Sequence, residues 1–106
     1  MNDDDLSTEP LIRVVCAAIR HKDGTVIAGT RHYDSIMRAT ILRMFKGQPN
    51  EVVAAREAGW YDCEQGFLNN KQEYLTREQA WKVAEAAKQI RQVTGTPGTI
   101  YSEDLY

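Results

Sequence analysis

Two apolar segments near the start of the chain predict a β-hairpin. Residues 11–19 are rich in β-branched and small apolar side chains, which is typical of a strand. Asp23 and Gly24 follow, and both residues tolerate the positive φ angles of a tight turn. Residues 25–31 are therefore predicted to form the returning strand.

Apolar residues at helical spacing predict two main helices. The first is expected over residues 34–45, with Asp34 able to cap its start. The second is expected to begin after Thr76, which is spaced with Gln79 as a capping box, and to continue to about Val93. Its apolar face carries mostly small side chains, so a sheet or another chain must pack closely against it.

The middle of the chain has weaker patterns. Residues 51–59 are ambiguous and could form a short helix capped by Asn50. After them we expect a second hairpin. Its extended segments are residues 60–63 and 66–68, its asparagine-rich turn is residues 69–72, and its return strand is residues 73–75.

Together these elements predict an α+β fold, in which a small antiparallel sheet of two hairpins packs with two main helices. Residues 11–106 are expected to form a single domain, and the acidic, polar residues 1–10 to be disordered. A chain of this size buries only about 65% of its unfolded surface. Several tyrosines also lie outside the clear core, so we expect the protein to assemble as an oligomer.

The net charge of −2 conceals an uneven distribution of charge. Six acidic residues lie in the two ends of the chain, whereas residues 11–102 carry 13 basic and nine acidic residues, a net charge of +4. Eight of the basic residues are arginine, whose planar group binds phosphate or carboxylate with two hydrogen bonds. The body of the protein therefore favours an anionic ligand, and a solvated basic surface is the alternative.

The composition argues against several classes of protein. No apolar run approaches the roughly 18–20 residues that a membrane span requires, and the acidic start is unlike a secretory signal. Cys16 and Cys63 are expected to be reduced thiols of a cytosolic protein. The basic residues of the last helix are partly balanced by Glu78 and Glu85, so duplex nucleic acid is not the expected partner.

Metal and catalytic motifs are not found in the sequence. His21 and His32 are separated by a predicted strand, and neither is spaced with a cysteine as in common zinc sites. Cys16 lies in an apolar strand and is expected to be a core residue, while the reactivity of Cys63 is left open. We therefore predict no metal, no cofactor and no catalytic residue.

One enzyme family offers an alternative. Residues 14–31 resemble the first hairpin of Nudix hydrolases, and Arg56, Glu57 and Gly59 weakly resemble the end of the catalytic box of that family. The box needs several acidic residues on one helix to hold Mg²⁺ at a pyrophosphate. The paired glutamates and the opening glycine are missing here, so a divergent nucleotide pyrophosphate hydrolase is retained only as the alternative.

Five short strings, taken in order, resemble a different family. They occupy residues 16–19, 29–32, 64–68, 75–80 and 101–106. This order is similar to that of the Thoeris anti-defence family of the first type, small phage "sponge" proteins. The resemblance implies a protein that binds and sequesters a glycocyclic ADP-ribose isomer without cleaving it. Residues 44–62 do not match the pattern.

The resemblance also implies partners and a location. Some members hold cyclic oligonucleotides, such as cyclic trinucleotides or dinucleotides, at a separate site and block CBASS as well as Thoeris signalling. Members assemble as dimers and, in some cases, as hexamers, with ligands near the subunit interfaces. The expected location is the cytoplasm of the infected bacterial host, and residues 11–106 are expected to be one nucleotide-binding domain.

Three residues are the first candidates for such a site. Phe67 is expected to stack on the adenine ring, because base–aromatic stacking contributes about 1–3 kcal/mol. Arg31 can pair with phosphate oxygens, and His32 can donate a hydrogen bond. The alternatives are that Phe67 is a core residue and that Arg31 and His32 end a strand in solvent.

Four further residues complete the predicted set. Thr76 and Arg77 begin a helix, where exposed N–H groups and the helix dipole favour anions. Arg13 and Arg91 are lesser candidates for phosphate contact. The alternatives are that Thr76 acts only as a helix cap and that the arginines on the last helix are ordinary surface residues.

Overall fold

The computed structural model describes residues 11–105, and the predicted disorder of residues 1–10 lies outside that range. Its centre is a four-stranded antiparallel sheet with strand order β3-β2-β4-β5. The strands are β2 (Val14–Arg20), β3 (Val26–Gly29), β4 (Glu64–Asn69) and β5 (Tyr74–Thr76). The predicted pair of hairpins is confirmed, and β2 and β4 join them into one sheet.

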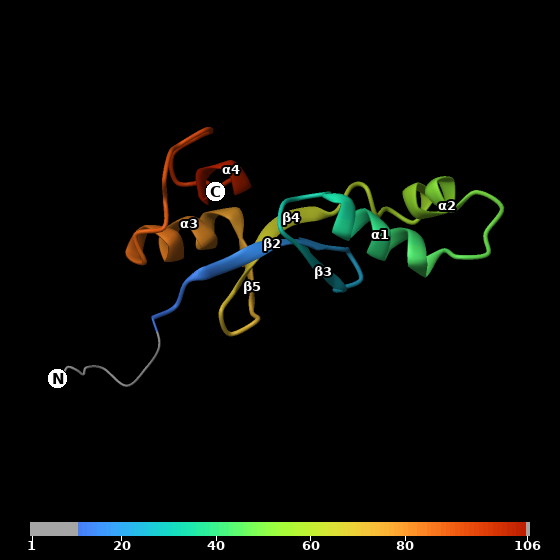
Figure 1. The fold of residues 1–106 in the computed structure, drawn as a ribbon, viewed down its shortest axis with the longest axis horizontal. Coiled ribbons are helices and arrows are strands. Elements are labelled where there is room, and N and C mark those ends of the chain that lie inside the picture. The colour runs from blue at the N-terminus through green and yellow to red at the C-terminus, as the bar shows by residue number, and fades with distance from the viewer. Residues whose placement is uncertain (1–10, 106) are drawn as a thin grey trace.

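Four helices accompany the sheet. They are α1 (Ser35–Met44), α2 (Glu51–Glu57), α3 (Arg77–Ala86) and the short α4 (Ser102–Leu105). Figure 1 shows α1 and α2 towards one end of the molecule and α3 and α4 towards the other, with the strands between them. The predicted α+β class is therefore confirmed.

The core lies between the sheet and the two longest helices. Ile19, Ile27 and Phe67 come from the strands, and Met37 and Ile41 come from α1. The buried residues of α3 are two alanines, Ala80 and Ala84. Because these side chains are small, the α3 backbone can approach the sheet closely, as its sequence pattern predicted.

Local capping signals determine where three helices begin. Asp34 caps α1 by accepting a hydrogen bond from the Met37 N–H at 2.9 Å, and Asn50 caps α2 through Val53. Thr76 and Gln79 form the predicted capping box at α3. The short helix that the sequence left ambiguous is thus present as α2.

The predicted end of α3 is wrong. The helix ends at Ala86, about seven residues before the expected Val93. Lys88 has a φ angle of +57°, which interrupts the helical path. The Gln89 side chain then donates to the Val14 carbonyl and accepts from the Val14 N–H, each at 2.8 Å. This long-range pairing, which helical spacing cannot reveal, replaces the last two helical turns.

The strand boundaries also differ from the prediction, most of all before β2 and before β4. The first strand begins at Val14 rather than at residue 11, and its register shifts between Val14 and Cys16. Residues 60–63 do not form a strand, because the Trp60 N–H donates back to the Ala55 carbonyl in α2 and the Asp62 N–H donates back to the Gly59 carbonyl. The second hairpin therefore consists of β4 and β5 alone.

We predict that Asp34→Ala destabilises the fold by about 0.5–2 kcal/mol, the usual range for a lost helix cap. The carboxylate accepts from the N–H groups of Thr30 and Arg31 as well as from Met37. Desolvation opposes ionisation, but these bonds outweigh it and lower the pKa of Asp34. Its contribution is therefore present at neutral pH and is lost as the pH falls below the ordinary aspartate value. Urea unfolding measures the difference, with the exposed Glu85→Ala as the control, and equal losses in both variants would contradict the prediction.

Candidate ligand-binding site

A cavity of about 380 Å³ lies where four parts of the chain meet. Its lining comes from the segment after β3, from β4, from the first residue of α3 and from the C-terminal segment. The lining residues are Arg31, His32, Gln65, Arg77, Tyr101, Ser102 and Glu103. Three of the seven predicted site residues, Arg31, His32 and Arg77, therefore come together here.

Arg77 has its guanidinium group held in one orientation. One nitrogen donates to the Ile100 carbonyl at 2.7 Å, and another donates to Gln65 Oε1 at 2.6 Å. The guanidinium carbon lies 4.4 Å from the centre of the Tyr101 ring, within the range of a cation–π contact. Burial lowers the pKa of Arg77 from its ordinary value, yet an arginine remains charged at neutral pH. The cavity thus contains an oriented, partly desolvated cation.

His32 connects the sheet to the C-terminal segment. Its Nε2 lies 2.7 Å from the Gly66 carbonyl, which can only accept, so Nε2 carries the proton. Its Nδ1 then accepts from the Ser102 hydroxyl at 3.0 Å. Burial lowers the pKa of His32, so the ring is neutral at physiological pH. The ring is fixed in position and tautomer by this pair of bonds.

The C-terminal wall of the cavity is held by the buried Asp104. Its carboxylate accepts from the N–H and the hydroxyl of Thr94 and from the Tyr101 N–H, at 2.7–3.0 Å. Its backbone carbonyl accepts from the Arg91 N–H at 2.7 Å. Ile100, with no exposed surface, anchors the same segment in the core. Tyr101, Ser102 and Glu103 are therefore presented by a clamped segment.

The rim of the cavity carries an ion pair. Arg31 Nη1 lies 3.8 Å from Glu103 Oε2, and the two side chains are 43% and 61% exposed. The backbone of Arg31 is held by Asp34, which accepts its N–H, while the Glu103 carbonyl accepts from Gln92 Nε2. Both residues thus have fixed backbones and side chains that face solvent at the entrance.

Phe67 does not occupy the predicted position. The sequence placed its ring against a base, but the ring has no exposed surface and belongs to the core. The His32 ring packs edge-on against it at 5.0 Å, and Arg77 lies 6.0 Å from its centre. Phe67 therefore packs in the core behind two cavity residues, His32 and Arg77. Tyr101 is the aromatic residue that lines the cavity.

The remaining predicted residues do not line this cavity. Thr76 is half-buried and caps α3 beside Arg77. Arg13 is exposed at the turn between β4 and β5, where its backbone pairs with Asn70. Arg91 is exposed beyond the end of α3 and uses its backbone N–H to hold Asp104. A direct contact of these three with a ligand in this cavity receives no support from the structure.

Sequence reasoning missed four of the lining residues, namely Gln65, Tyr101, Ser102 and Glu103. All four lie in strings that carry the family resemblance, at residues 64–68 and 101–106. The C-terminal string mixes apolar and acidic residues, and this pattern does not show which surface it packs against.

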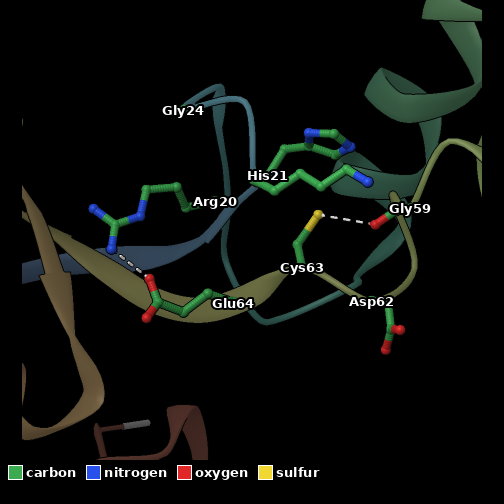
Figure 2. A pocket seen from close by; sticks show the side chains of 8 residues that line it. Arg20, His21, Gly24, Gly59, Asp62, Cys63 and Glu64 are labelled. Atoms are coloured by element: carbon green, nitrogen blue, oxygen red, sulfur yellow. Dashed lines mark hydrogen bonds and ion pairs between the residues drawn. The ribbon is translucent and has the colours of Figure 1, made fainter.

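A second cavity, of about 570 Å³, lies between the β2–β3 turn and the segment before β4. Figure 2 shows Arg20 paired with Glu64 on one side and the Cys63 thiol directed at the Gly59 carbonyl on the other. His21 donates to the Ala58 carbonyl and accepts from the Asp23 N–H. Burial raises the pKa of the Cys63 thiol. Most of the polar side chains that line this second cavity are thus bonded to other groups of the protein.

Within residues 11–105, no three histidine, cysteine or acidic residues are grouped so that they could hold a metal ion. No helix in the same range is long and apolar enough to cross a membrane.

Comparison with known families identifies the group to which the sequence belongs. The family described as Phage T4 y16D protein matches residues 13–106, which is most of the sequence. The chain belongs to this family. The y16D match supports a phage origin and includes all seven lining residues. No curated protein and no solved structure gives a significant match.

Replacing His32 should reduce the loss in free energy of unfolding that occurs when the pH falls from neutral to acid. Because burial lowers the folded-state pKa of His32, the unfolded state binds more protons below the ordinary histidine value of 6.5. Stability from the neutral ring is therefore present above that pH and is lost as the pH falls. Urea unfolding at pH 7.5 and 5.5 should show a larger loss for the wild type than for His32→Gln, and identical losses would contradict the assignment of a neutral, buried ring.

Proposed function

We propose that the chain is a phage anti-defence protein that binds a glycocyclic ADP-ribose messenger and holds it intact. The observation that carries the proposal is the cavity that joins Arg31 and Arg77 with the Tyr101 ring. The phage origin rests on the y16D family, and the ligand class rests on the resemblance together with this geometry.

The cavity has groups suited to each part of such a ligand. Two guanidinium groups can bind the pyrophosphate through paired, charge-assisted hydrogen bonds. Arg77 is already oriented by Gln65 and Ile100, so binding costs little additional side-chain entropy. The planar Arg77–Tyr101 pair can stack with an adenine ring. A volume of about 380 Å³ is within the usual range for small-molecule sites.

The polar groups at the cavity favour retention of the ligand over its hydrolysis. His32 uses both ring nitrogens within the protein, on Gly66 and Ser102. Its lowered pKa makes it a poor base. Glu103 is the one carboxylate among the lining residues, whereas the hydrolase alternative uses several carboxylates around Mg²⁺.

The proposal retains two expectations about assembly and location. We expect a homo-oligomer, dimer or hexamer, as the family resemblance implies. We also expect the protein to act in the cytoplasm of the infected host, where it would block Thoeris signalling and, if it also holds cyclic oligonucleotides, CBASS signalling.

Incubation with glycocyclic ADP-ribose tests the function directly. The protein should retain the messenger during gel filtration, and heat denaturation should release it unchanged in mass and chromatographic position. A ring-opened product that is one water heavier, with its pyrophosphate bond cleaved and its two phosphates still on one molecule, would instead support the hydrolase alternative. A protein fraction free of nucleotide would contradict nucleotide binding altogether.

Substitution of Arg77 tests the site. Arg77→Gln should weaken binding of the messenger at least about tenfold, or roughly 1.4 kcal/mol, because the oriented cation is lost. Arg13→Gln is the matched control, since it makes the same charge change at an exposed position outside the cavity. Titration calorimetry measures both, and thermal unfolding verifies that each variant is folded. Equal weakening by the two variants would show that only overall charge matters.

A further inference from the structure

We propose that Glu103 is the residue by which this site selects a sugar-bearing phosphate over a bare one, an inference that rests on the proposed function. In this assignment the carboxylate accepts hydrogen bonds from ribose hydroxyls, while the two arginines bind the phosphates. Glu103 is not among the seven site residues predicted from the sequence.

The position of Glu103 is determined by its neighbours. Ser102 and Asp104 on either side are buried, and the Glu103 carbonyl accepts from Gln92 Nε2 at 2.8 Å. The backbone is therefore fixed on the C-terminal wall. The side chain, in contrast, is 61% exposed and lines the cavity. A fixed backbone that presents an accessible carboxylate at a cavity entrance is suited to contact with a ligand.

The ion pair between Glu103 and Arg31 is too long to contribute much to the stability of the fold. The separation of 3.8 Å exceeds the 2.7–2.9 Å of a charge-assisted hydrogen bond. Ion pairs between side chains this exposed contribute little to stability. The Glu103 carboxylate can therefore accept from a hydroxyl donor of a ligand at small cost to stability.

The charges around Glu103 determine which end of a ligand can lie beside it. A carboxylate accepts hydrogen bonds from ribose hydroxyls in dinucleotide sites and repels a phosphate placed at the same position. Arg77 is held by Gln65 and Ile100 and can attract the phosphate end. A ligand must then supply an anion and hydroxyl groups side by side, as a nucleotide does. Inorganic pyrophosphate supplies only the anion, and the Glu103 carboxylate repels it.

Titration calorimetry with two probes, glycocyclic ADP-ribose and inorganic pyrophosphate, tests this assignment. The variant is Glu103→Gln, which removes the charge and keeps the size. Glu85→Gln, on the exposed face of α3, is the matched control. The variant should bind the nucleotide more weakly and pyrophosphate more tightly, so that the preference for the nucleotide falls at least about tenfold. The control should keep the wild-type preference.

The outcomes separate this assignment from the proposed function. If the wild type binds the nucleotide and Glu103→Gln strengthens both probes by the same factor, Glu103 is only a competing anion and the assignment is overturned. An unchanged preference overturns it as well. If the wild type does not bind the nucleotide, the proposed function fails, and this inference fails with it.

Discussion

The buried carboxylate of Asp104 holds together the part of the structure on which the candidate site depends. It joins Thr94 to Tyr101 and so closes the C-terminal segment on itself. The Asp104 carbonyl also binds the Arg91 N–H just after α3. Hydrogen bonds to a buried charged acceptor are among the strongest in proteins, and leaving that acceptor without donors is costly. Without this clamp, Tyr101, Ser102 and Glu103 would depend on Ile100, His32 and Gln92 alone for their place beside the sheet.

The opposite wall is connected to this clamp through His32. The Gly66 carbonyl selects the ring tautomer, and the remaining nitrogen accepts from Ser102 at the start of α4. The ring rests edge-on against the fully buried Phe67. The core, the sheet and the C-terminal segment are thus coupled at one imidazole. This coupling explains how a small chain can keep an open cavity beside its core without filling it.

Sequence reasoning was accurate where local chemistry decides the structure. Asp34 and Thr76 cap helices through neighbours only three residues away, so their patterns predict the helix starts correctly. The end of α3 depends instead on the pairing of Gln89 with Val14, 75 residues away, which spacing cannot show. Phe67 has the residue type of a stacking partner, but its burial depends on sheet register and on which face α3 covers. The docking of Tyr101 beside Arg77 is likewise a long-range outcome.

A structure of the protein with glycocyclic ADP-ribose bound tests the central claim most directly. The account predicts an intact ligand between α3 and α4, with its phosphates on Arg77 and Arg31 and its adenine against the Arg77–Tyr101 pair. A ligand found in the larger cavity beside Arg20 and Cys63, or a cleaved ligand in either cavity, would contradict the account.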